Sequence, residues 1–105
     1  MKKVIIESPY AGDVERNIAY ARKCVNDSLS KGEAPFAGHL LYPQDGILDD
    51  DKKFERILGI EAALVWGKEA ELTAVYEDYG ISNGMKLGIE RAKKENRPIE
   101  YRRIL

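Results

Sequence analysis

The chain has few of the residues that build covalent or metal sites. Its 105 residues include one cysteine, Cys24, and one histidine, His39. A lone cysteine forms no internal disulfide, and the chain has no zinc-ligand spacing. Cys24 lies within a helical pattern without a basic partner in a recognisable motif, so we interpret it as an inert helix residue. We expect a cytoplasmic protein that uses no metal and no cofactor.

Charge of one sign and long apolar runs are also missing. With 17 basic and 18 acidic residues the net charge is -1, so a nucleic acid polymer is not an expected partner. No apolar run approaches the roughly 18 residues that span a membrane, and the apolar run that follows the two N-terminal lysines is too short for a signal peptide. The apolar content of 44% is typical of a folded domain, and we expect a single one, residues 1–105.

Strand and helix patterns alternate along the chain. Runs of β-branched and apolar residues predict strands at 3–7, 34–37, 71–76 and 99–104, and helical periodicity predicts helices at 13–29, 51–69 and 82–96. Asp13 and Ser82 are the expected N-caps of the first and third helices. This alternation predicts a three-layer α/β fold: an open, mainly parallel four-stranded sheet, order 2-1-3-4, with helices on both faces.

Two glycine-bearing turns then meet at one edge of the sheet. Ser8–Gly12 follows the first strand and Asp78–Gly84 follows the third. In the order 2-1-3-4 these strands are neighbours, and open α/β sheets bind ligands where the strand order reverses. Backbone N–H groups at the start of the third helix suit an anion such as phosphate, and Asp78 suits sugar hydroxyls.

Several polar residues have two readings. Glu61 lies on or beside the apolar stripe of the second helix, so it either enters a cleft or reaches solvent. Glu7, at the end of the first strand, could also face the site. His39 is either a general acid or base or a hydrogen-bonded structural residue. We interpret Asp49–Asp51 as N-capping residues of the second helix, since they match no EF-hand spacing.

These motifs resemble a known family. Ser8-Pro-Tyr-Ala-Gly12, Pro35-Phe-Ala-Gly-His-Leu-Leu-Tyr42 and Asp78-x-Gly-x-Ser-x-Gly-Met85 resemble the nucleoside 2-deoxyribosyltransferase-like group, particularly its small, mostly uncharacterised members from phages and bacteria. The resemblance implies a flavodoxin-like, Rossmann-like sheet, a nucleoside or nucleotide pocket, and homo-oligomers in which a neighbouring subunit completes the site. The predicted ligand-binding residues are Ser8, Pro9, Tyr10, Gly12, Asn17, His39, Tyr42, Asp78, Gly80, Ser82, Asn83, Gly84 and Met85.

One position departs from the family pattern. Family enzymes cut or transfer at the N-glycosidic bond with a carboxylate nucleophile, which suits an oxocarbenium-like transition state. That glutamate follows the Asp-x-Gly turn, where this chain has Gly84, and no carboxylate occurs between Asp78 and Glu90.

Three functional hypotheses follow. In the first, the protein binds a nucleotide or nucleotide-derived molecule without turnover, for example a phage anti-defence protein in the host cytoplasm that sequesters a cyclic ADP-ribose type immune signal. In the second, it is an N-glycosidase or deoxyribosyltransferase in which Glu61 or Asp78 supplies the carboxylate. In the third, it is a protein-interaction module. We expect no membrane partner and expect self-association, because the small core gains from a buried interface.

Overall fold

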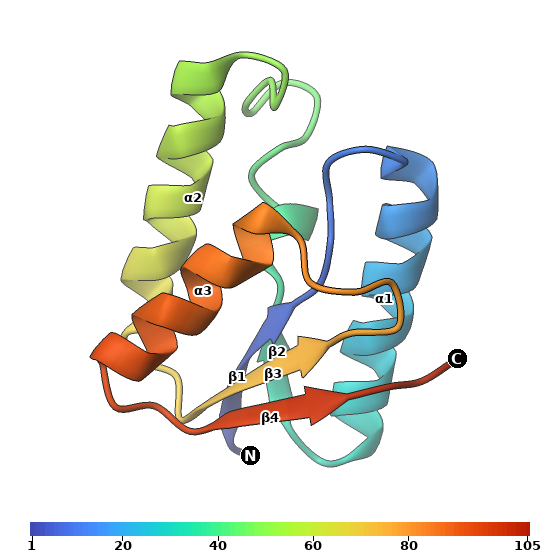
Figure 1. Cartoon of the computed structure of the whole chain (residues 1–105), viewed down its shortest axis with the longest axis vertical. Helices are drawn as coiled ribbons and strands as arrows, with labels where there is room; N and C mark the ends of the chain where they lie inside the picture. Colours follow the sequence, from blue (N-terminus) through green and yellow to red (C-terminus); the bar gives the residue numbers. More distant parts are fainter.

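One four-stranded sheet organises the computed structural model, which describes residues 1–105 (Figure 1). All three pairs of neighbouring strands are parallel, in the order β2-β1-β3-β4. The predicted α/β fold and strand order 2-1-3-4 are confirmed. The elements are β1 (Lys3–Glu7), α1 (Val14–Ser30), β2 (Ala34–Phe36), the short 3-10 helix η1 (Gly38–Leu40), α2 (Lys53–Gly67), β3 (Leu72–Tyr76), α3 (Asn83–Lys94) and β4 (Ile99–Arg102).

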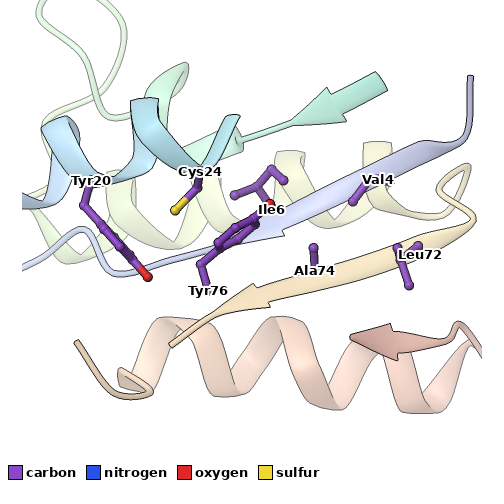
Figure 2. Packing of buried hydrophobic residues seen from close by; sticks show 7 residues of the cluster. All are labelled: Val4, Ile6, Tyr20, Cys24, Leu72, Ala74 and Tyr76. Atoms are coloured by element: carbon purple, nitrogen blue, oxygen red, sulfur yellow. The ribbon is translucent and has the colours of Figure 1, made fainter. Parts of the chain in front are cut away.

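The larger part of the core lies between the sheet and α1. Alternate residues of β1 and β3 point toward α1, because successive side chains of a strand face opposite sides of the sheet. They pack against Tyr20 and Cys24 of α1 (Figure 2). The cluster consists of Val4, Ile6, Tyr20, Cys24, Leu72, Ala74 and Tyr76. Cys24 is fully buried and burial raises the pKa of its thiol to about 12, as expected for an inert residue.

The opposite face of the sheet is covered more sparsely. Val75 of β3 packs against Met85 and Ile89 of α3. β3 is buried along its whole length, as a central parallel strand with both faces covered should be. Ile5 and Glu7 of β1 also point to this side, where they line a cavity. The side of the sheet that faces α2 and α3 therefore has both a small hydrophobic core and a cavity.

Two helix starts agree with the sequence. Asp13 accepts a hydrogen bond from the backbone N–H of Arg16, and the Ser82 hydroxyl accepts one from the N–H of Met85 at 3.3 Å. The predicted N-caps of α1 and α3 are therefore confirmed. None of the helices combines the length and the hydrophobicity that crossing a membrane requires.

The start of α2 corrects the sequence interpretation. The helix begins at Lys53 after an N-cap residue, Lys52, that makes no side-chain capping bond. The Asp49 carboxylate instead accepts the N–H of Asp51, and the Asp49 N–H donates to Glu55. The acidic run therefore closes a turn of its own before the helix, and its interpretation as an N-cap was wrong.

The orientation of α2 also differs from the expectation. Its apolar periodicity predicted one side made of Phe54, Ile57, Leu58, Leu64 and Val65. Of these only Leu64 lines the cavity, and the other four are exposed, Phe54 by 78%. A second set of small and apolar residues, among them Ala63, faces the sheet across the cavity instead. Helix α2 has apolar residues on two sides, and the side that faces the sheet is the one with the glycines and alanines.

Candidate functional site

A cavity of about 460 Å³ opens between α2, α3 and the carboxyl end of β1. Its position is the point where the strand order reverses, with β1 leading to β2 on one side and lying beside β3 on the other. Its volume falls within the roughly 300–1,000 Å³ of small-molecule sites. The loop after β1, η1, the inner side of α2 and the first turn of α3 all contribute to its wall.

Most of the predicted ligand-binding residues line this cavity. They are Ser8, Tyr10, Gly12, His39, Tyr42, Ser82, Asn83, Gly84 and Met85. The two glycine-bearing turns thus meet at one site, although they lie about 70 positions apart in the sequence. Four predicted residues do not line it: Pro9, Asn17, Asp78 and Gly80.

Asn17 supports the loop after β1 from behind. Its side-chain amide donates to the carbonyl oxygens of Tyr10 and Ala11 at 2.9 and 3.1 Å. The side chain is buried, and its oxygen accepts from Arg16. The structure therefore gives Asn17 a positioning role, since it holds the backbone from which Tyr10 reaches the cavity.

Ser8 and His39 form a buried polar pair in the wall. The Ser8 hydroxyl and His39 Nε2 are joined by a hydrogen bond of 2.6 Å. Burial lowers the pKa of His39 to about 4, so the ring is neutral near pH 7. No carboxylate bonds the other ring nitrogen, so the orienting acid of a Ser-His-Asp triad has no counterpart here. The pair shapes and hydrogen-bonds the wall as a neutral unit.

Glu7 is the carboxyl group of the cavity. It is the last residue of β1, and its side chain forms no hydrogen bond or ion pair within the protein. Burial raises its pKa to about 8, and the positive charge of Arg97 opposes that rise only in part. Near neutral pH Glu7 therefore holds its proton, unlike an ordinary glutamate.

Gly88 of α3 makes room for this side chain. A β-carbon at position 88 would overlap the carboxyl group of Glu7. The absence of a side chain there lets Glu7 lie against the helix backbone while its carboxyl group borders the cavity. The sequence placed Glu7 at the edge of the site but gave no sign of Gly88, because this contact joins residues 81 positions apart.

Arg97 closes the inner end of the cavity. Its guanidinium donates to the Thr73 hydroxyl at 2.8 Å and to the carbonyl of Gly67 at 2.9 Å, and it pairs with Glu95 at 2.7 Å. Its Nε and Nη1 donors are thus bound to other groups, and no ion pair joins the guanidinium to Glu7. Arg56, an exposed residue of α2, is the other arginine of the lining and forms no ion pair.

Asp78 lies outside the cavity. Its carboxylate accepts from the Tyr20 hydroxyl at 2.5 Å and from the backbone N–H groups of Ile104 and Leu105 at 3.0 and 2.9 Å. Burial raises the pKa of Asp78, but these hydrogen bonds outweigh it and hold the pKa below its ordinary value. The structure uses Asp78 to fasten the segment after β4, so the predicted sugar or catalytic contact has no support from its position.

Glu61 lies outside the cavity as well. It is exposed on α2, and the neighbouring residues Ile60, Ala63 and Leu64 face inward instead. Of the two readings of Glu61, the structure shows the one in which the side chain reaches solvent. No group of three or more histidine, cysteine, aspartate or glutamate side chains is arranged to hold a metal ion.

The fold and cavity define an open parallel α/β protein with a small-molecule-sized site at the reversal point of its sheet. The chain belongs to the family of the domain of unknown function DUF7768, whose model matches residues 2–102. A comparison with curated proteins gives no match.

The fold is similar to that of the 2-deoxyribosyltransferase from the psychrotolerant bacterium Bacillus psychrosaccharolyticus, a biocatalyst for the synthesis of antiviral and antitumoral nucleosides. The two chains superpose with a TM-score of 0.64 and 15% identity over 96% of this chain and 72% of the other. This similarity confirms the predicted fold relationship. Membership of the deoxyribosyltransferase-like family stays a prediction.

Proposed function

We propose that the cavity binds a nucleoside or a small nucleotide. The observation that carries the proposal is the meeting of both glycine-bearing turns around one cavity of about 460 Å³ at the reversal point of the sheet. The similarity of the fold to a 2-deoxyribosyltransferase supports this ligand class.

The lining offers different chemistry for each part of such a ligand. Tyr10 and Tyr42 provide aromatic surface on which a base can stack. At the start of α3, the backbone N–H groups of Asn83 and Gly84 have no partner in the helix, and they suit a phosphate or a sugar hydroxyl. Arg56 adds a positive charge to the same wall.

Binding without turnover is the form of the proposal that the side chains favour. An oxocarbenium-like transition state needs a negative charge near the anomeric carbon. The carboxyl group in the cavity, Glu7, is neutral near pH 7, and the two carboxylates considered from the sequence, Glu61 and Asp78, lie elsewhere. Sequestration of a cyclic ADP-ribose type signal is one use that such binding would serve.

A second candidate function is N-glycosidic bond cleavage or transfer. The observation in its favour is that Glu7 forms no bond within the protein and borders the cavity. In this case Glu7 would act in its ionised form, and the ligand would be recovered as free base and sugar.

Calorimetric titration followed by mass analysis of the recovered ligand tests both candidates. The panel contains adenosine, cytidine, their 5′-monophosphates, ADP-ribose and its cyclic isomers. Binding with intact recovery supports the first candidate, recovery of free base supports the second, and no heat with any compound would contradict both.

Matched tyrosine variants locate the binding. Tyr42→Ala removes a cavity aromatic, and Tyr101→Ala removes a half-exposed tyrosine of β4 outside the cavity. Stacking on a base contributes about 1–3 kcal/mol, so Tyr42→Ala should weaken binding about fivefold or more. Tyr101→Ala should leave the affinity unchanged, and an equal effect of both variants would contradict the location.

Self-association stays a prediction. If a second copy docks on this chain, the exposed apolar side of α2, with Phe54, Leu58, Val65 and Trp66, is the surface that we propose for it. Sedimentation velocity of the wild type and of Phe54→Ser checks this, and a monomer at all concentrations would contradict it.

A further inference from the structure

Glu7 is a carboxyl group at the cavity that has no partner within the protein. No donor of the chain forms a hydrogen bond with it, and its oxygens stay open to the cavity, since no fully buried side-chain oxygen lacks a partner. The nearest cationic group that acts on it, Arg97, donates to Thr73, Gly67 and Glu95 instead. A carboxyl group that is partly withdrawn from water and has no protein partner keeps its hydrogen-bonding capacity free, so a ligand that supplies the missing hydrogen bonds gains from this arrangement.

The surroundings of Glu7 favour its neutral form. Besides Glu7, the titratable and charged residues of the cavity lining are Tyr10 in the loop after β1, His39 of η1, Tyr42 after η1, Asp50 before α2, Glu55 and Arg56 of α2, and Arg97 before β4. From α3 only uncharged residues line the cavity, namely Asn83, Gly84, Met85 and Gly88. Only Arg97 favours the ionised form of Glu7 by its charge, and burial outweighs it.

We propose that Glu7 is a ligand-binding residue that acts as a neutral carboxylic acid, with its O–H donating to a ring nitrogen or carbonyl of an uncharged nucleobase and its carbonyl oxygen accepting from the adjacent N–H. The proposal rests on the proposed function, because it assigns the base end of the ligand to Glu7. Adenine, with N7 beside its 6-amino group, presents such an acceptor–donor pair.

Placing the base at Glu7 also determines where the phosphate of the ligand lies. An anionic group next to Glu7 would lose its solvation without gaining a counterion. The phosphate therefore belongs at the first turn of α3, near Asn83 and Gly84, and the base belongs at the side of the Glu7 carboxyl group that borders the cavity. The site thus takes molecules that are neutral at one end and anionic at the other.

The first test needs no ligand. The carboxyl carbon of Glu7 is followed by NMR from pH 4 to pH 10 in the wild type, with Glu7→Gln to assign the signal. The proposal expects a midpoint near 8. A midpoint near the ordinary value of 4.5 would overturn it, whatever the protein binds.

The second test is the pH dependence of adenosine and AMP binding. If only the neutral acid binds, the affinity of the wild type is level below pH 8 and falls about tenfold per pH unit above it. Glu7→Gln carries a permanent donor and acceptor, so it should lose this fall and bind more tightly than the wild type at pH 9.5. Glu7→Ala should bind weakly at every pH.

The possible failures are distinguishable. If the wild type binds neither probe nor any other compound of the panel, the proposed function fails, and the assignment of Glu7 to a base fails with it. If the wild type binds but its affinity rises with pH, or if Glu7→Gln abolishes binding, the nucleotide site stands and the neutral-acid role of Glu7 is overturned.

Discussion

The carboxyl group of Glu7, at the end of β1, lies against the backbone of Gly88 in the middle of α3. A β-carbon on residue 88 would overlap it. The contact joins the sheet to the helix across the wall of the cavity and leaves Glu7 without a hydrogen-bond partner of its own. Two residues far apart in sequence thus determine the chemistry of the site.

Gly88→Ala should separate stability from binding. Alanine is favoured over glycine by about 1 kcal/mol within a helix, and the overlapping atoms belong to the flexible end of Glu7. We expect the thermal midpoint to be maintained or raised, while the displaced carboxyl group lowers ligand affinity. Gly84→Ala, whose β-carbon would meet only Ser82 Oγ at 4.0 Å, is the control for the stability change. Weaker stability with unchanged affinity would contradict this account of Gly88.

Glu7 should make the folded state less stable as the pH rises. Its pKa is about 8 in the folded protein and near 4.5 in an exposed glutamate. Between these values the folded state holds a proton that the unfolded chain releases, so unfolding becomes more favourable with increasing pH. Relative to Glu7→Gln, the wild type should lose a few kcal/mol of unfolding free energy from pH 5 to pH 8. The unfolding free energy of both proteins is measured by urea denaturation at each pH. The same change with pH in the wild type and in Glu7→Gln would contradict the prediction.

His39 should act in the opposite direction on the acid side. Its pKa is about 4 when folded and 6.5 when exposed, so the unfolded chain takes up a proton that the folded protein excludes. The stability contributed by neutral His39 is therefore lost as the pH falls from 6.5 to 4. His39→Gln should reduce the slope of unfolding free energy against pH in this range, as measured by urea denaturation. An unchanged slope would show that His39 is not the group responsible.

Gly38 should tolerate alanine only if α2 changes with it. A β-carbon on Gly38 would lie 2.6 Å from the β-carbon of Ala63, where η1 meets α2. Both atoms are attached directly to backbone, so we expect Gly38→Ala to destabilise the protein by about 1–3 kcal/mol. Adding Ala63→Gly removes the overlap. A double-mutant cycle should give a favourable coupling energy of about 1 kcal/mol or more. If the stability changes of the two substitutions simply add, the β-carbons at positions 38 and 63 do not clash.

Asp78→Asn should lower stability and leave the cavity intact. The carboxylate accepts hydrogen bonds from Tyr20, Ile104 and Leu105. An amide in its place offers one acceptor fewer and carries no charge, and a hydrogen bond to a charged group contributes about 1.5–3 kcal/mol, so the partly exposed site should lose about 1 kcal/mol or more. The measurement is urea denaturation together with AMP titration. If the variant keeps its stability but loses AMP binding, Asp78 is a ligand-binding residue and this prediction is wrong.

The sequence predicted those features that depend on neighbouring residues. Asp13 and Ser82 cap their helices because a cap requires only a residue and the amide three positions later. The order of the strands is a common one for open α/β sheets with right-handed crossovers, and the structure has it. The convergence of Ser8–Gly12 with Ser82–Gly84 followed from that order, since parallel neighbours end at the same edge.

Features that depend on contacts between residues far apart in the chain could not be predicted from the sequence. Helix α2 has apolar residues on two sides, so periodicity could not tell that Ala63 faces the sheet while Phe54 is exposed. Asp78 was read as a ligand residue because nothing in its own segment shows that Ile104 and Leu105 return to it. The state of Glu7 likewise depends on Gly88 and Arg97, which are 81 and 90 positions away in the sequence.

Amide chemical-shift mapping with AMP shows whether the cavity is the binding site. We expect AMP to perturb the backbone amides of residues that line the cavity, foremost Tyr10, Asn83, Gly84 and Gly88, at micromolar to millimolar concentrations, and to leave Tyr101 on β4 unchanged. No perturbation up to millimolar AMP, or shifts confined to residues outside the cavity, would contradict it.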